Sequence, residues 1–125
     1  MEKLMQLSAE KKRSRLIIKR GRENIALLLS EIVFFYTEQK IVYVIERSGK
    51  KYMVDRNLAE LENELDKQFF FRANRQYIIN INFIKGFKPY EKVKLIVDIS
   101  IPDINHCIII SQETAPAFRR WMYDA

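Results

Sequence analysis

The sequence predicts a mainly β domain with two short helices. Most apolar residues stand in short runs rich in Val, Ile, Phe and Tyr, separated by polar turns, and this composition is typical of strands. Helical spacing of apolar residues occurs in two places, at 58–65 and at 118–122. Because the chain has 125 residues, 48% of them apolar, it is long enough for one domain with a packed core.

The N-terminal half predicts strands joined by polar turns. Residues 1–14 are charged and weakly periodic, so we expect a basic linker or arm ahead of a domain that spans residues 15–125. The runs 16–18 and 25–28 flank a turn with Gly21 at its left-handed position, which predicts a hairpin. Further strands are expected over residues 32–36, 41–47 and 52–54. The strand 41–47 is apolar on both faces and should be covered on both sides.

Residues 57–67 predict the first helix. One apolar stripe runs along it, formed by Leu58, Leu61 and Leu65. Asn57 and Glu60 have the spacing of a capping box. The outer face is acidic and carries Glu60, Glu62, Glu64 and Asp66. We expect this acidic face to point away from a polyanionic partner.

In the C-terminal half, two apolar runs flank a polar island, defined here as residues 72–76. The runs, 69–71 and 77–80, should be strands, and the island should lie at a strand end facing solvent. Further strands are expected over residues 83–88, 93–97 and 106–110, with a loop at 89–92 and a turn at 101–105. A short helix capped by Ser111 or Thr114 closes the chain. Its buried face should carry Phe118, Trp121 and Met122.

The residues that catalysis or metal binding would need are sparse. The single histidine, His106, is adjacent to the single cysteine, Cys107, and neighbours on a strand point to opposite faces. A Cys/His pair for nucleophilic catalysis would need to be within hydrogen-bonding reach. A metal site would need three or four ligands, and no His/Cys cluster exists. We therefore expect no enzyme activity, no metal and no cofactor, with Cys107 buried and inert.

The charge of the chain is unevenly placed. Residues 1–22 carry eight basic and two acidic side chains, which accounts for the whole net charge of +6. A basic surface suits a phosphate backbone, and it equally suits an acidic protein. No secretory signal is evident, and no apolar run reaches the ~20 residues of a membrane span. Together with the lone cysteine, this predicts a cytoplasmic protein without a membrane partner.

The polar island contains side chains that can recognise bases. Arginine can form two hydrogen bonds with guanine O6 and N7, and Asn or Gln can do the same with adenine N6 and N7. The alternative is an ordinary polar turn whose arginines pair with carboxylates. The island's own composition leaves both interpretations open.

Residues 70–80 read F-F-R-A-N-R-Q-Y-I-I-N, which resembles the F-x-R-x-H-R-S-Y-x-V-N signature of LytTR DNA-binding domains. The resemblance extends over roughly residues 16–122, from the strands at 32–36 and 42–45 to the closing Ile108–Ser111. It implies an elongated arrangement of antiparallel sheets. It also implies an output domain of bacterial two-component response regulators, which reads DNA with loop-tip side chains and without a recognition helix.

The resemblance implies four base-contact candidates, which are Lys40, Asn74, Arg75 and Gln112. The phosphate-contact candidates are Arg72 in the island, which could equally brace the turn, and the hairpin-turn cations Lys19, Arg20 and Arg22. Three positions depart from the family pattern: Asn74 replaces His, Gln76 replaces Ser, and Gln112 replaces a late Arg. These departures predict a different target sequence.

The function predicted is sequence-specific binding of double-stranded DNA by a transcriptional regulator. The resemblance further implies direct-repeat sites bound in pairs, hence a dimer on DNA, and a receiver domain in the full-length protein. The alternative is a β-rich protein-interaction module whose basic patch binds an acidic partner.

Overall fold

The computed structural model describes residues 14–101 and 104–124, and within them it is mainly β with two helices. The predicted fold class is thereby confirmed. The predicted basic arm, residues 1–14, lies outside the described residues except for Ser14. Pro102 and Asp103, in the predicted turn at 101–105, lie outside them as well.

The centre of the molecule is a five-stranded antiparallel sheet with the strand order β5-β4-β3-β7-β6. Its strands are β3 (Ile32–Glu38), β4 (Ile41–Glu46), β5 (Lys51–Val54), β6 (Phe70–Arg72) and β7 (Tyr77–Asn80). β3 and β7 pair with Tyr36 opposite Tyr77, so that the end of β3 meets the start of β7. The polar island between β6 and β7 is thus placed beside the β3–β4 turn.

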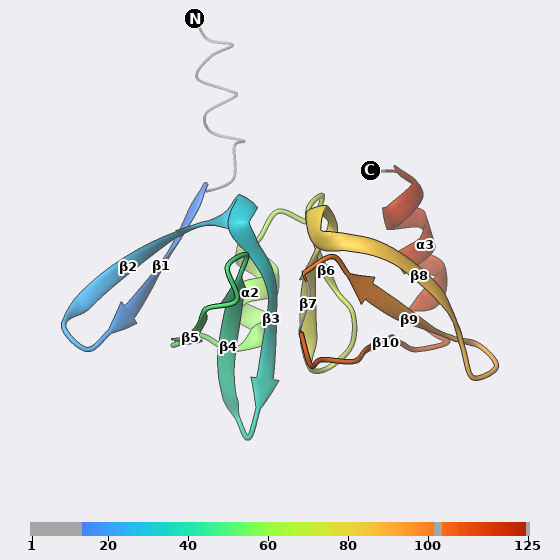
Figure 1. Ribbon diagram of the computed structural model, residues 1–125, viewed down its shortest axis with the longest axis horizontal. Helices are drawn as coiled ribbons and strands as arrows, with labels where there is room; N and C mark the ends of the chain where they lie inside the picture. Colours follow the sequence, from blue (N-terminus) through green and yellow to red (C-terminus); the bar gives the residue numbers. More distant parts are fainter. Residues whose placement is uncertain (1–13, 102–103, 125) are drawn as a thin grey trace, which may run out of the picture.

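Two smaller antiparallel sheets flank the central one, as predicted for an elongated arrangement (Figure 1). One is the hairpin of β1 (Arg15–Arg20) and β2 (Glu23–Leu28). The other contains β8 (Ile84–Tyr90), β9 (Lys94–Ile99) and β10 (Ile108–Ile110). In Figure 1 they lie on opposite sides of the central sheet along the longest axis of the molecule.

The core is divided by the central sheet. One cluster joins β1 and α2 (Leu58–Glu64) to the face of β3 that carries Ile32 and Phe35. The second joins β9, β10 and α3 (Ala115–Asp124) to the face that carries Phe34 and Tyr36. β4 contributes Val44 to the first cluster and Ile45 to the second. The expectation that this strand is covered on both faces is confirmed.

The first helix starts where predicted and ends earlier. The Asn57 side chain accepts from the Glu60 N–H at 2.8 Å, and the Glu60 carboxylate accepts from the Asn57 N–H at 2.9 Å, which confirms the capping box. The predicted helix over 57–67 was too long, because Leu65 is extended and its side chain is buried. The chain then turns at Asp66, whose carboxylate accepts from the Gln68 N–H.

Two further expectations were wrong. The predicted loop at 89–92 is shorter, because Pro89 and Tyr90 still pair with β9, opposite Leu95 and Lys94. β8 is at the edge of its sheet, where a proline without an N–H is tolerated. Cys107 is exposed and not buried, because the last strand begins two residues later than predicted, at Ile108.

Asn80 at the end of β7 is the one buried polar residue among the described core residues, with 1% exposure. Its Nδ2 donates to the Ile32 carbonyl at 2.8 Å, and its Oδ1 accepts from the Asn82 N–H at 2.9 Å. The side chain thus connects the start of β3 to the turn after β7. Asn80 therefore holds backbone groups in place.

We predict that Asn80→Ala lowers the free energy of unfolding by ~1–3 kcal/mol, because it leaves a buried carbonyl and an N–H without partners. Chemical denaturation measures the effect. Asn24→Ala on the exposed face of β2 is the matched control and should change stability little. Equal stability of the two variants would contradict the role of Asn80.

Candidate nucleic-acid interface

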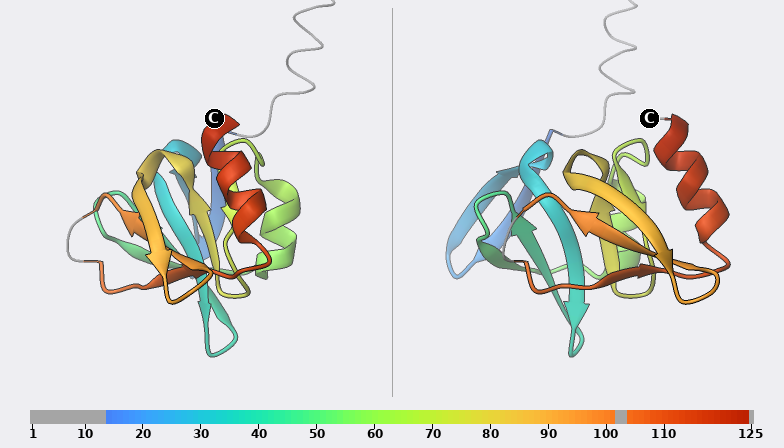
Figure 2. Two further views of the ribbon diagram at one scale, coloured as in Figure 1. Left: turned by 90° about the vertical axis from the view of Figure 1, so that its right-hand side faces the viewer. Right: turned by 45° about the vertical axis from the view of Figure 1, so that its right-hand side comes forward.

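The β3–β4 turn, the polar island and the end of β10 lie on one side of the molecule. Figures 1 and 2 show the turn and the loops projecting to the same side in all three views. Hydrogen bonds join them. The Thr37 N–H donates to the Gln76 carbonyl at 3.0 Å, and Gln76 Nε2 donates to the Thr37 carbonyl at 3.3 Å. The end of β3 and the island are therefore held together by a reciprocal pair.

The Asn74 side chain connects the island to β10. Its Nδ2 donates to the Ile109 carbonyl at 2.7 Å. Its Oδ1 accepts from the Gln76 N–H at 2.7 Å and from the Tyr77 N–H at 3.1 Å. The sequence predicts a base contact for Asn74, whereas the structure places this carboxamide inside the protein's own network. Asn74 supports the loop in this structure.

Arg72 also braces the island. Its Nε donates to the Asn74 carbonyl at 2.7 Å and its guanidinium to the Arg75 carbonyl at 3.1 Å. A third bond, of 3.0 Å, goes to the carboxylate of Glu62 on α2. Of the two roles expected for Arg72, a phosphate contact or bracing of the turn, the structure shows the bracing: the side chain is 27% exposed and its donors face carbonyls and a carboxylate. The acidic face of α2 therefore does not point wholly away, since Glu62 reaches the base of the island.

The Arg75 side chain has no partner among the described residues, whereas the side chains of Arg72 and Asn74 are hydrogen-bonded within the protein. Its side chain is exposed, and its guanidinium makes no hydrogen bond or ion pair with the residues that the structure describes. Its backbone is fixed, because the Arg75 carbonyl accepts from Arg72 and the next N–H is held by Asn74. The loop thus presents an exposed cationic side chain on a hydrogen-bonded backbone.

Lys40 lies at the tip of the β3–β4 hairpin. Gln39 and Lys40 have φ values of 52° and 67°, and Glu38 pairs with Ile41, which defines a tight two-residue turn. Such turns favour Asn-Gly, because left-handed φ costs other residues about 1–2 kcal/mol. Two long polar side chains occupy it here and project into solvent.

Gln112 follows the end of β10 in the turn before α3, and its side chain is exposed. It is three residues beyond Ile109, which the island contacts, and Lys40 is three residues beyond Thr37. Since three extended residues span at most about 11 Å, both Cα atoms lie within that distance of a residue bonded to the island. Lys40 and Gln112 thus each follow, by three residues, a residue that is hydrogen-bonded to the island.

The β1–β2 turn carries the other predicted phosphate contacts. Lys19, Arg20 and Arg22 are exposed around Gly21, whose φ of 65° confirms the predicted left-handed position. The Arg20 guanidinium lies 5.8 Å from the centre of the Tyr52 ring. In Figures 1 and 2 this turn projects to the same side as the β3–β4 turn, farther along the molecule.

Tyr77, the residue that follows the island, is paired with His106. The Tyr77 hydroxyl and His106 Nδ1 share a hydrogen bond of 2.7 Å. Burial lowers the pKa of His106 and raises the pKa of Tyr77, so both side chains are neutral at pH 7. Phe34 and Tyr36 pack edge-on against the imidazole. Tyr77 and His106 are therefore packed against the aromatic part of the core next to the island.

Two observations concern other classes of site. No group of three or more His, Cys, Asp or Glu within the described ranges is arranged to hold a metal ion. None of the helices in these parts of the chain has the length and apolar character to span a bilayer.

The sequence did not predict two of the groups that hold the island in place, the Glu62 carboxylate and the Ile109 carbonyl. Glu62 is ten residues from Arg72, and the Ile109 carbonyl is 35 residues from Asn74. The composition of the helix around Glu62 indicates only a solvated acidic face. The Ile109 carbonyl could not be predicted as a partner, because every residue has a backbone carbonyl. The register of β7 against β3 would have indicated the Gln76–Thr37 pair.

We predict that Asn74→Ala loosens the island while leaving the rest of the domain folded. The change removes the bridge to Ile109 and leaves two N–H groups without their acceptor, at a cost of ~1–3 kcal/mol. Hydrogen–deuterium exchange should become faster at residues 74–77 and stay slow in β4. Unchanged exchange at the island would contradict the bracing role.

Comparison with known proteins also indicates a DNA-binding domain. A family model described as the LytTr DNA-binding domain matches residues 22–123. The transcriptional regulatory protein YpdB of Escherichia coli K12 is 23% identical over 95 residues, which are 76% of this chain and 38% of the relative. YpdB of Shigella flexneri matches to the same extent. The chain thus spans 38% of the length of these curated relatives.

A solved structure has the same fold. The LytTr DNA-binding domain of a putative methyl-accepting/DNA response regulator from Bacillus cereus aligns with a TM-score of 0.75 and 24% identity. The alignment covers 88% of this chain and 97% of that one. Since the family model spans most of the chain, this chain belongs to the LytTr DNA-binding domain family.

Proposed function

We propose that this domain binds double-stranded DNA sequence-specifically through Lys40, Arg75 and Gln112, as the DNA-binding part of a transcriptional regulator. The observation that carries the proposal is the state of Arg75. Its guanidinium is exposed and unpaired among the described residues, while Asn74 and Arg72 hold its backbone. Recognition groups are most effective when their support is rigid.

Each tip has a chemistry suited to a base edge. Arg75 can donate two hydrogen bonds to guanine O6 and N7, and Gln112 can pair with adenine N6 and N7. Lys40 can donate to guanine or to a neighbouring phosphate. Because the Asn74 carboxamide is bonded within the protein, the reading set is three side chains and not the four that the sequence predicts.

Phosphate contacts would supply most of the affinity. Lys19, Arg20 and Arg22 project on the side of the recognition tips, at a distance from them along the molecule. Such contacts position a protein on the duplex without reading its sequence. Arg72 is not part of this set, because it is engaged with Glu62 and the island.

The wider context is also part of the proposal. YpdB is a transcriptional regulatory protein, and the solved neighbour comes from a putative response regulator. We infer that this domain acts beside a receiver domain, on direct repeats occupied by two copies. The exposed free Cys107 suits a reducing cytoplasm. The proposal includes no catalytic activity.

Selection of binding sites from a random duplex pool tests the proposal. Enrichment of a repeated motif would support it and would give the half-site spacing. Affinity for the selected duplex should fall steeply with salt and keep a sequence preference at moderate salt. Recovery of no motif, with binding only to acidic proteins, would favour a protein-interaction module instead.

We predict that Arg75→Ala weakens binding to the selected duplex by ~1–3 kcal/mol and relaxes specificity at one base pair, because a bidentate base contact is lost. Fluorescence anisotropy with single-base variants of the duplex measures both effects. Arg47→Ala removes another exposed arginine, which follows the opposite end of β4 and lies 3.9 Å from Glu31, and this variant should bind like the wild type. Equal losses in both variants would contradict a base contact by Arg75.

We predict that Lys40→Gly weakens duplex binding by ~1 kcal/mol or more without destabilising the domain, because glycine accepts the left-handed φ while the ammonium is lost. Gln39→Gly is the matched control, since it relieves the same turn and removes no cation. Thermal unfolding and anisotropy should separate the two variants in affinity alone. Loss of affinity in both would indicate that the turn's shape matters and not the lysine.

A further inference from the structure

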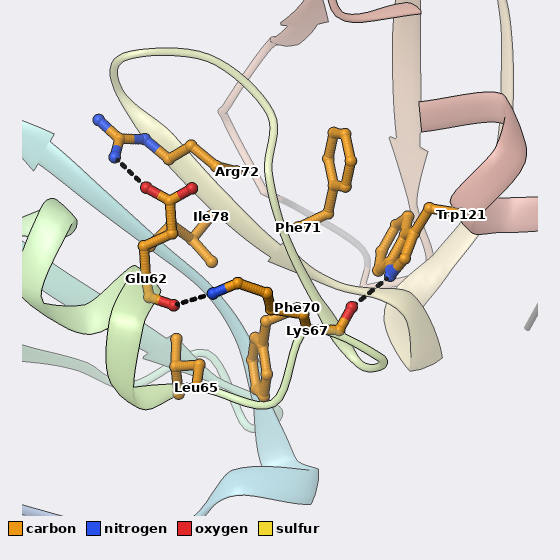
Figure 3. Close-up of a pocket in the computed structure, with 8 residues that line it drawn as sticks. All are labelled: Glu62, Leu65, Lys67, Phe70, Phe71, Arg72, Ile78 and Trp121. Carbon is orange, nitrogen blue, oxygen red and sulfur yellow. Dashed lines mark hydrogen bonds and ion pairs between the residues drawn. The ribbon is translucent and has the colours of Figure 1, made fainter. Parts of the chain in front are cut away.

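A groove of about 380 Å³ lies between α2, β6 and α3, and its lining includes Arg72 at the start of the island. Its floor is apolar and includes Leu65, Phe70, Phe71 and Ile78 (Figure 3). The volume is within the range of small-molecule sites, which are typically apolar with a few polar groups. The DNA-binding role leaves this groove unexplained.

Trp121 of α3 forms one wall. Its ring stacks on Phe71 with centroids 5.0 Å apart. Its Nε1 donates to the Lys67 carbonyl at 3.0 Å, as Figure 3 shows. The hydrogen bond holds the edge of the indole and the stacking on Phe71 holds its face. The ring lines the groove with an apolar surface. Trp121 is also the only tryptophan in the sequence, so it reports on this site alone.

The rim of the groove has an excess of positive charge. It carries Lys67 and Arg72, against a single carboxylate, Glu62. Glu62 pairs with Arg72 at 3.0 Å, whereas Lys67 Nζ donates only to the Glu62 backbone carbonyl, at 3.2 Å. Among the described residues Lys67 therefore has no carboxylate partner and keeps free N–H donors beside an aromatic floor.

We propose that this groove binds a small carboxylic acid with a compact apolar or aromatic body. The body lies on Phe70, Phe71 and Trp121, and the carboxylate accepts from Lys67 Nζ. A charged donor next to an apolar floor favours an amphipathic anion over a neutral or cationic ligand.

The same groove is coupled to the island. Arg72 borders it, and the Arg72 guanidinium also holds the carbonyls of Asn74 and Arg75. A bound carboxylate offers Arg72 a further acceptor, which competes with these carbonyls and loosens the recognition loop. Occupancy of the groove then weakens DNA binding, and DNA weakens occupancy by the same factor. This coupling rests on the proposed function, whereas ligand binding does not.

The test of the site is a titration of the domain with 3-phenylpropionate, followed by Trp121 fluorescence excited where the phenyl ring does not absorb. A saturable change is expected. The neutral 3-phenylpropionamide should bind at least about tenfold more weakly, because a charge-assisted hydrogen bond is lost. Equal responses to the acid and the amide, or no saturable response, would overturn the site.

Two variants with a matched control sharpen the titration. Lys67→Met keeps the apolar stem and should weaken binding of the acid by about tenfold. Glu62→Gln keeps a hydrogen-bonding partner for Arg72 but removes the opposing charge, so it should tighten binding. Lys85→Met removes another exposed lysine, on β8, and should change nothing. Unchanged affinity in Lys67→Met would refute the assigned contact.

The coupling is tested with a labelled duplex at constant ionic strength. Saturating 3-phenylpropionate should weaken duplex binding several-fold, and the amide at the same concentration should not. An unchanged duplex affinity with the groove occupied would refute the coupling. The fluorescence titration uses no DNA, so a failure of the proposed function leaves its outcome unaffected.

Discussion

The Asn74 carboxamide is the contact on which the recognition surface depends. One side chain donates to β10 and accepts two N–H groups of its own loop, so it joins the island to a strand 35 residues away. Each neutral hydrogen bond contributes only about 0.5–1.5 kcal/mol, but removing the shared side chain leaves all three partners unpaired. Aspartate has the same shape and lacks the donor that the Ile109 carbonyl needs. The position therefore requires a group with both a donor and an acceptor.

Because Asn74 is held in this way, the side chains of the island have different roles. Arg72 and Asn74 direct their polar groups inward to carbonyls and N–H groups, which leaves Arg75 with a fixed backbone and a free guanidinium. Binding then costs the conformational entropy of one side chain and not that of a loop. The β3–β4 hairpin reaches a similar state by a different route, since its two-residue turn holds Lys40 at a left-handed φ. In both loops the backbone is held by hydrogen bonds or strand pairing while the cationic side chain is exposed.

Local patterns predicted most of the strands and helices, whereas the arrangement of the sheets was implied by the family resemblance alone. The strands follow from β-branched and aromatic runs, and the α2 capping box follows from Asn57 and Glu60, because these signals lie within a few residues of each other. The errors arose where distant contacts decide. Pro89 stays in β8 because that strand is an edge, and Leu65 leaves the helix to enter the core. Neither fact is visible in a local window of sequence.

The site was predicted in part for the same reason. The family resemblance indicated three candidate loops, and in the structure hydrogen bonds join the island to the end of β3 and to β10. The resemblance did not distinguish a polar side chain that is held within the protein from one that is left exposed, since Asn74 and Arg75 are adjacent and both polar. The difference lies in the Ile109 carbonyl and in Glu62, which approach from other parts of the chain. Burial and partner geometry decide the role, and composition does not.

This distinction gives the departures from the family signature different meanings. Histidine, the family residue at the position of Asn74, also carries one donor and one acceptor when neutral, so the exchange conserves the bridging chemistry. Gln112 replaces an arginine at an exposed tip where no described partner constrains it. That exchange alters what the tip can recognise, from a cationic donor pair suited to guanine to an amide suited to adenine. A change of target sequence relative to other family members should therefore arise at the base pair beneath Gln112 and not at the one beneath Asn74.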